Sequence, residues 1–332
     1  MRFALAAIGL LAGCHAGSST SAAIHAKPVE IAESDFRGTF NGATLYATVD
    51  AHDGIASGTC FYEDDGTDVP LRGAIDEHGV MMLQQVGDKG PVSSVTLTAD
   101  ATGAWTGTWK SADQSRSGTA RLEPIARKPG DPVFVAARTI RQTRSDTRVP
   151  VVLGLADRAF EKKLDDALLA KASVRAPAGS WRVTTDYSVP LNERGYVSFE
   201  IISRYADHAS DKSGGADGLT AAVDRQAIAS TAADLIDVVK AKRLLVDMAE
   251  RGYARCSTSL TDEHALDTIG AGVLTKTGVA IEHDTCDDHV HSPAWDELSF
   301  ATLGSALRAG TAFEPFWNGY AVITRSDPRT TP

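Results

Sequence analysis

Between Phe36 and Pro124 the chain alternates short runs of strand-forming residues with turn residues. Glycine closes each turn, and the turns recur every 11 to 13 residues. Short strands at this spacing, separated by turn residues, are typical of an antiparallel sheet or barrel. Trp105 and Trp109 share one face of a strand, which we assign to the core. The pattern predicts strands at 44–49, 58–62, 80–83, 95–98 and 104–109, with turns at Asp53-Gly54, Asp65-Gly66, His78-Gly79, Lys89-Gly90 and Thr102-Gly103.

After this region the pattern changes to a mixture of strands and amphipathic helices. A charged stretch broken by proline and glycine, at 126–132, marks a linker. The chain is therefore expected to be an α+β protein, in which an antiparallel β-meander or barrel-like domain at 35–125 precedes a mixed α+β domain at 133–325. A short tail at 326–332 ends the chain.

The second domain has two helical patterns and one clear hairpin. An apolar run leads into a helix at 157–171, whose apolar residues share one face and whose start Asp157 can cap. Strands at 181–189 and 196–202 form the hairpin, and a second helix covers 231–251. The remaining segments are expected to be a polar loop at 207–218, then short strands and turns with a short helix at 300–307.

The first residues carry an export signal. Met1-Arg2 precedes about ten apolar residues, too few for a transmembrane helix of about twenty. The run closes on Leu11-Ala12-Gly13-Cys14, which resembles the lipobox of bacterial lipoproteins. That resemblance implies removal of a signal peptide at 1–13, a lipid anchor on Cys14 and a flexible tether at 14–34. Because His15 stands where Asp favours inner-membrane retention, we expect an outer-membrane lipoprotein that faces the periplasm or the cell surface.

The net charge limits the kind of partner, and the cysteines indicate a disulfide. The formal net charge of −10 gives no basic footprint for nucleic acid, so no nucleic-acid partner is expected. In an exported chain, Cys256 and Cys286 flank one segment and are the natural disulfide pair. Closing that loop would stabilise the fold by roughly 3.5 kcal/mol. Cys60 is left over and is expected to behave as a small buried hydrophobe.

The densest polar group in the sequence lies between residues 283 and 291. Imidazole and carboxylate suit zinc or copper, so one interpretation is a metal site made by His283, Asp287, His289 and His291. The other is an acidic loop around the disulfide. Sequence motifs for nucleophiles, zinc proteases and phosphate or dinucleotide loops do not occur, so we assign no catalytic residue and no cofactor.

Two further groups are candidates for contact with a partner. The carboxylates of Asp284, Asp287 and Asp288 suit a basic partner, since opposite potentials steer association. Phe316 and Trp317 belong to an aromatic cluster near the end of the chain. That cluster either stacks on a sugar ring or closes a core.

Short motifs support two resemblances to bacterial envelope proteins. Residues 58–62, 71–73 and 107–109 resemble β-rich repeats that precede a second domain in some proteobacterial lipoproteins. The second half resembles an extracytoplasmic domain of unknown function, which occurs in lysozyme-sensing anti-sigma factors and beside peptidoglycan deacetylase domains. Asp217 stands where that family usually has His. The resemblance is carried by residues 150–155 (P-x-x-x-G-L), Tyr205, Gly214-Gly215-Ala216-Asp217 and Ala222-Val223-Asp224.

The resemblance implies a non-catalytic module that binds or senses a protein or glycan partner in the envelope or outside the cell. It is an analogy between folds, whereas function resides in particular sites. The alternative is an enzyme that acts on peptidoglycan or another envelope polymer, which would gather titratable groups in a cleft.

Overall fold

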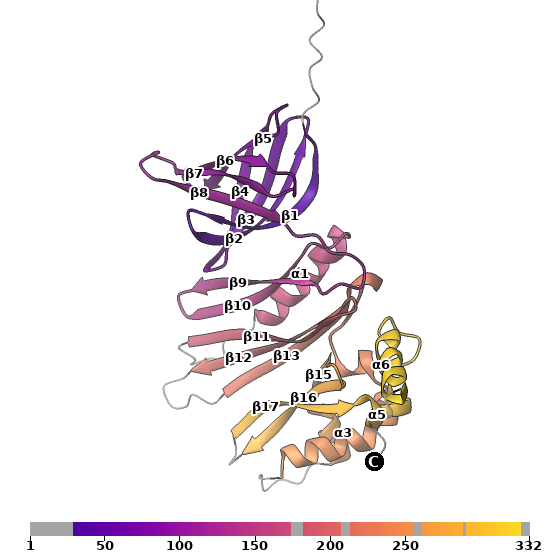
Figure 1. Cartoon of the computed structure of the whole chain (residues 1–332). Coiled ribbons are helices and arrows are strands. Elements are labelled where there is room, and N and C mark those ends of the chain that lie inside the picture. The colour runs from indigo at the N-terminus through magenta and orange to yellow at the C-terminus, as the bar shows by residue number, and fades with distance from the viewer. Residues whose placement is uncertain (1–28, 174–181, 207–212, 255–260, 288–289, 327–332) are drawn as a thin grey trace, which may run out of the picture.

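The computed structural model describes residues 29–173, 182–206, 213–254, 261–287 and 290–326. Its first part is a closed barrel in which each strand pairs antiparallel with the next and β8 pairs with β1 (Figure 1). The β-meander or barrel that the turn spacing predicted is thereby confirmed. Its strands are β1 (Ile31–Phe40), β2 (Ala43–His52), β3 (Ile55–Tyr62), β4 (Asp65–Ile75), β5 (Val80–Gly87), β6 (Gly90–Ala99), β7 (Trp105–Ser111) and β8 (Ser117–Pro124).

Apolar side chains fill the interior of the barrel. Strand residues alternate between the two faces of a sheet, so every second residue points inward. Leu45, Met81 and Leu97 are fully buried there, and Trp105 and Trp109 also belong to this core, as the even spacing predicted. The strands therefore close around side chains of their own.

The second part holds both strands and helices. A six-stranded sheet has the order β14-β13-β12-β11-β10-β9, and only β10 and β11 pair in parallel. Helix α1 connects these two strands and packs Phe160, Leu164 and Leu168 against the sheet. The elements are β9 (Phe134–Gln142), β10 (Ser145–Leu153), α1 (Arg158–Ala172), β11 (Arg182–Glu193), β12 (Tyr196–Ala206), β13 (Ser213–Ala222), η1 (Val223–Arg225) and β14 (Ala227–Ala229).

A three-stranded sheet, β15-β16-β17, and the remaining helices complete the chain (Figure 1). They share one apolar core, in which Leu235, Leu245, Ile281 and Phe316 are buried. Within the described residues, no helix is long and apolar enough to cross a membrane. The elements are α2 (Ala232–Leu235), α3 (Val238–Gly252), α4 (Asp262–Asp267), β15 (Ile269–Leu274), β16 (Gly278–Asp287), β17 (Val290–Ser299), α5 (Phe300–Leu303), η2 (Gly304–Ala306) and α6 (Glu314–Ser326).

Several predicted elements of the second part need correction. The helix predicted at 231–251 is two helices, because Asp237 caps α3 anew and its backbone N–H donates to Ala306 at 2.7 Å. The polar loop predicted at 207–218 ends in strand β13, and α6 lies where short strands and turns were expected. By contrast, Asp157 caps α1 as predicted, accepting from the N–H of Phe160 at 2.9 Å.

The barrel packs directly on the edge of the six-stranded sheet, beside β9 and β10 (Figure 1). Tyr46 and Phe61 from the barrel share an apolar cluster with Ala136, Val151 and Leu153. This cluster joins the two parts of the chain around a segment that the sequence identified only as a linker.

The linker itself is fixed by polar contacts with the second part. Arg127 forms an ion pair with Asp224 at 2.6 Å, and the N–H of Gly130 donates to the same carboxylate at 2.7 Å. Because one side chain holds two points of the linker, the segment at 126–132 has a defined path along the second part.

The turn predicted at Asp65-Gly66 lies two residues earlier, at Glu63-Asp64, and β4 already begins at Asp65. A Cβ atom on Gly66 would lie 2.6 Å from the carbonyl oxygen of Thr139 in β9, closer than real Cβ contacts. Gly66 therefore allows a strand of the second part to approach the barrel, and its sequence signal was mistaken for that of a turn.

Candidate functional site

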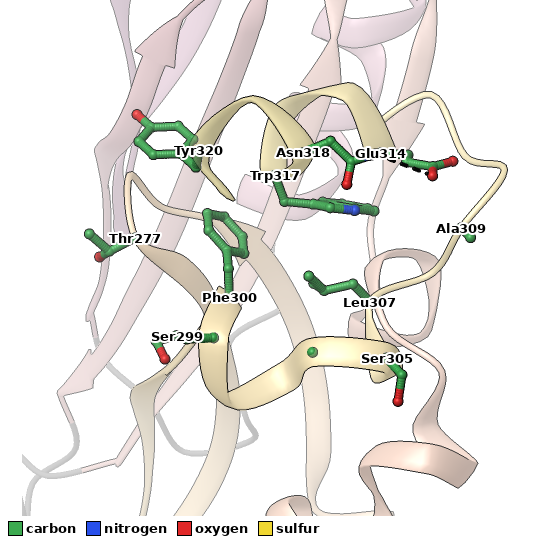
Figure 2. Close-up of a pocket in the computed structure, with 12 residues that line it drawn as sticks. Thr277, Ser299, Phe300, Ser305, Leu307, Ala309, Glu314, Trp317, Asn318 and Tyr320 are labelled. Atoms are coloured by element: carbon green, nitrogen blue, oxygen red, sulfur yellow. Dashed lines mark hydrogen bonds between the residues drawn. The ribbon is translucent and has the colours of Figure 1, made fainter. Parts of the chain in front are cut away.

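The second part contains a cavity of about 880 Å³ between α5 and α6 (Figure 2). Its volume falls in the range of about 300–1,000 Å³ that is usual for small-molecule sites. The residues that line it are Thr277, Ser299, Phe300, Ala301, Gly304, Ser305, Leu307, Ala309, Glu314, Trp317, Asn318 and Tyr320.

Local backbone features hold the two walls apart. Ser299 caps α5 by accepting from the N–H of Thr302 at 3.1 Å, which places Phe300 at the start of the lower wall. Gly304 ends α5 with φ of +49°, a conformation that favours glycine. The N–H of Gly310 then donates to the carboxylate of Glu314 at 2.7 Å, which fixes the start of α6. The chain between these points loops around the cavity and leaves it open.

Aromatic and aliphatic side chains form the inner walls. Figure 2 shows Trp317 above the hollow, with Phe300 and Leu307 on the other side. Phe300 and Tyr320 have ring centroids 6.0 Å apart, and both rings contact Phe316, which is fully buried. The cavity wall is thus continuous with the core of the second part.

Polar groups lie toward the rim. The amide of Asn318 donates to Glu314 at 3.3 Å, and the hydroxyl of Thr277 donates to Glu297 at 2.5 Å. The hydroxyl of Tyr320 donates to Glu193. Burial, and secondarily this hydrogen bond, raises the pKa of Tyr320 to about 12. Tyr320 is therefore neutral at physiological pH.

The aromatic residues predicted to contact a partner have different positions. Phe316 is buried in the core, in line with the second of the two interpretations of the aromatic cluster, in which it closes a core. Trp317 is 4% exposed and lines the cavity, so its ring forms part of the cavity wall and does not lie on the outer surface. The sequence identified the aromatic cluster, but it could not show which rings lie in the core and which line the cavity.

Only part of the predicted metal group lies within the described residues. His283 is buried, with Nε2 3.4 Å from a carboxylate oxygen of Asp296. No group of three metal-ligating side chains occurs in the described part of the chain. Asp288, His289 and the side chains of Asp287 and His291 lie outside it, so the metal site remains a prediction.

The remaining acidic candidate, Asp284, is partly buried in β16 beside His283, with its backbone oxygen 3.1 Å from Nδ1 of the imidazole. Neither residue borders the apolar cavity. The structure therefore does not bring the acidic and the aromatic candidates together in one described site.

The two described cysteines, Cys60 and Cys286, were predicted to be a free buried thiol and part of a disulfide, respectively. Cys60 is free and buried in the barrel, where burial raises the pKa of its thiol to about 11. Cys286 forms a disulfide. Cys256 and Cys14 lie outside the described residues, so their disulfide and lipid attachments remain predictions.

Sequence reasoning missed a buried charged cluster at the junction of the two parts. Asp35 of β1 is buried, forms an ion pair with Arg158 of α1 and accepts from the N–H of Gly154 at 2.6 Å. Arg158 also pairs with Glu161 at 2.6 Å. Burial, with the charge of Asp35 in addition, raises the pKa of Glu161 to about 7. These carboxyls lie at the junction of the two parts and do not border the cavity.

Comparisons with known proteins add little to this description. No family model matches the chain, and no curated protein matches it. A crystal structure of a DUF3298 family member from Bacteroides fragilis is similar at 10% sequence identity, with a TM-score of 0.38. The match covers 55% of this chain and 96% of that one. A TM-score of this size does not identify a shared fold.

Proposed function

We propose that the chain is a lipid-anchored protein of the bacterial envelope that binds a partner through the apolar cavity between α5 and α6. One observation carries the proposal. The cavity of about 880 Å³ has aromatic and aliphatic inner walls and a few polar side chains at its rim. Ligand sites commonly combine an apolar interior with a small number of placed polar groups.

At the apolar cavity the titratable groups favour binding over chemistry, because Tyr320, which lines it and has a raised pKa, stays neutral at physiological pH. An enzyme would direct acids or bases with shifted pKa values into the cleft. The carboxyls of Glu161, Asp165 and Glu282, whose pKa values rise to about 7, all lie outside the apolar cavity. Glu161 and Asp165 instead accept hydrogen bonds from the backbone N–H groups of Leu155 and Val152.

The shape and chemistry of the cavity indicate the part of the partner that enters. Phe300, Leu307 and Trp317 would contact an apolar group, such as an aromatic ring or a short acyl chain. Glu314 and Asn318 at the rim can hydrogen-bond an amide or hydroxyl next to that group. An envelope or extracellular partner with such an exposed apolar group is therefore the expected ligand.

A neutral apolar dye tests the site. N-phenyl-1-naphthylamine fluoresces when it leaves water, so the purified protein should increase its emission in a saturable way. Ala309→Trp and Ser305→Trp fill the cavity from exposed positions on its wall, and each should reduce this signal at least about tenfold. Ala101→Trp, at an exposed turn of the barrel, is the matched control and should bind as the wild type does.

Equal dye binding by all variants would contradict the proposal. Turnover of peptidoglycan fragments by the purified protein, lost on replacing one carboxylate, would instead support the enzyme alternative. A partner captured by the wild type but not by Ala309→Trp would connect the cavity to its biological ligand.

A further inference from the structure

A second hollow, of about 460 Å³, lies where the six-stranded and three-stranded sheets meet below the end of α1. Three charged side chains face it: Lys171 from α1, Asp217 from β13 and Glu282 from β16. Small or apolar residues make up most of the remaining lining. This hollow is separate from the apolar cavity, since the two share no residue.

The charges in this hollow do not balance when Glu282 is ionised. Lys171 is already paired with Asp217, and its ammonium also lies 3.5 Å from the carbonyl oxygen of Ser230. Glu282 accepts one long hydrogen bond, from the N–H of Ala271 at 3.4 Å. Among the described residues, no Lys, Arg or His forms an ion pair with Glu282. A partly buried carboxylate therefore lies at the edge of a cavity without a cation.

The backbone opposite Glu282 leaves space for its carboxyl. A Cβ atom on Gly270 would lie 1.8 Å from Oε2 of Glu282, which no real contact allows. Any side chain at residue 270 would therefore displace the carboxyl from its present position. Burial, with the charges of Asp284 and Asp217 in addition, raises the pKa of Glu282 to about 7, as expected of a carboxyl that lacks a cationic partner.

The other wall determines which kind of cation fits. Val238, Leu266 and Ile269 line the hollow and would contact an aliphatic chain. A calcium ion takes about six to eight oxygen ligands, whereas the described part of the chain gathers no group of three metal-ligating side chains. An ammonium group needs only a few acceptors and tolerates an apolar neighbour, as lysine side chains do.

We propose that this second hollow binds a primary ammonium group carried on a short aliphatic chain, with Glu282 as its counter-ion. The ammonium donates to Glu282, and the chain lies against the apolar wall. The same chemistry occurs in the lysine side chain of a peptide or protein and in a free alkyl diamine.

Calorimetric titration of the full chain with simple amines tests this site. The probes are cadaverine and Nα-acetyl-lysine N-methylamide, and the Nε-acetylated form of the latter is the neutral control. We expect at least one amine to bind and the acetylated form not to. A hydrogen bond to a charged group is worth enough that Glu282→Gln should weaken binding about 10- to 100-fold.

Matched variants separate the site from a general charge effect. Glu297→Gln removes an exposed carboxylate on the neighbouring strand, outside the hollow, and should leave amine binding unchanged. Gly270→Ala should weaken binding by displacing Glu282, although it removes no charge. Binding of the lysine derivative alone would assign the site to a peptide, and binding of cadaverine alone to a free diamine.

Three results would overturn the inference: no binding of either amine, equal binding of the acetylated form, or unchanged binding by Glu282→Gln. Dye binding in the apolar cavity should be the same in Glu282→Gln as in the wild type. The failure of this inference can therefore be distinguished from failure of the proposed function.

Discussion

At the scale of single residues, a buried ion pair joins groups that are far apart in the sequence. The carboxylate of Asp35 accepts from the hydroxyl of Thr48 at 2.7 Å within the barrel and pairs with Arg158 of α1. A buried carboxylate is costly unless it is paired and hydrogen-bonded, so this site requires both parts of the chain to be in place. No spacing rule connects residues 35 and 158, and sequence reasoning therefore could not find the pair.

Asp165 gives a pH-dependent prediction. Burial raises its pKa to about 7 from an ordinary value near 3.8, although it accepts from the N–H of Val152 at 2.9 Å. A raised folded-state pKa means that its contribution to stability is greatest below the unfolded pKa and is lost as pH rises towards 7. Asp165→Asn keeps the acceptor and cannot ionise. The free energy of unfolding of the variant should therefore rise, relative to that of the wild type, by roughly 1.4 kcal/mol for each pH unit between about 4 and 7.

Urea unfolding at pH 5 and pH 8 measures this difference. Asp166→Asn is the control, because Asp166 is the next residue along α1 and is exposed. Its effect should change by no more than about 0.5 kcal/mol between the two pH values. If the effect of Asp165→Asn changed as little between the two pH values as that of the control, Asp165 would ionise normally in the folded protein.

The cysteines give a second prediction at this scale. Cys286 forms a disulfide and Cys60 is free and buried, so peptide mapping without reduction should recover Cys256 linked to Cys286. Because the thiolate is the reactive form and the pKa of Cys60 is about 11, this thiol should alkylate only after denaturation. A peptide that links Cys60 to either other cysteine would contradict both expectations.

At the scale of elements, local signals located most barrel strands, and long-range contacts decided the exceptions. Turn glycines and β-forming residues lie close together in the sequence, so β2, β3, β5, β6 and β7 could be predicted from it. The division of one predicted helix into α2 and α3 depends on residues near 306 and 307, about 70 positions further along. The walls of the apolar cavity come from α5 and α6. The start of α6 is fixed locally, by the N–H of Gly310 donating to Glu314, but its apolar face packs on the distant core, and the helix was missed.

Gly66 gives a prediction about how two elements meet. A side chain there would collide with the backbone of Thr139 and the side chain of Arg138 in β9. Gly66→Val should therefore lower the free energy of unfolding by about 1–3 kcal/mol, as overpacked sites usually do. Thr67→Val, at the next and exposed residue of β4, is the control and should change it by less than about 0.5 kcal/mol. Equal stability of the two variants in urea would show that β4 and β9 can separate without cost.

At the scale of the whole molecule, the barrel lies at one end and the apolar cavity, between α5 and α6, lies toward the other (Figure 1). The six-stranded sheet connects them, and Tyr46 and Phe61 hold the barrel to it. If the chain is anchored through its first residues, the barrel and sheet would hold the cavity away from the membrane. The arrangement suits a protein whose partner approaches from the space beyond the lipid surface.

The anchor itself is the last prediction, and Cys14→Ser tests it. Only the thiol of Cys14 can form the thioether that the lipobox resemblance implies, so the variant should lose acyl labelling and leave the membrane fraction. The loss should be complete, because each buried methylene contributes about 0.8 kcal/mol and stable anchoring takes two lipid signals. Cys60→Ser is the matched control, since it removes a thiol that is buried in the barrel and should keep both the label and the location. Because the residues that line the apolar cavity all lie between Thr277 and Tyr320, released Cys14→Ser protein should still bind the apolar dye as the wild type does. A wild type that carries no lipid, together with a variant that stays on the membrane, would refute the anchor. Dye binding would still test the apolar cavity independently.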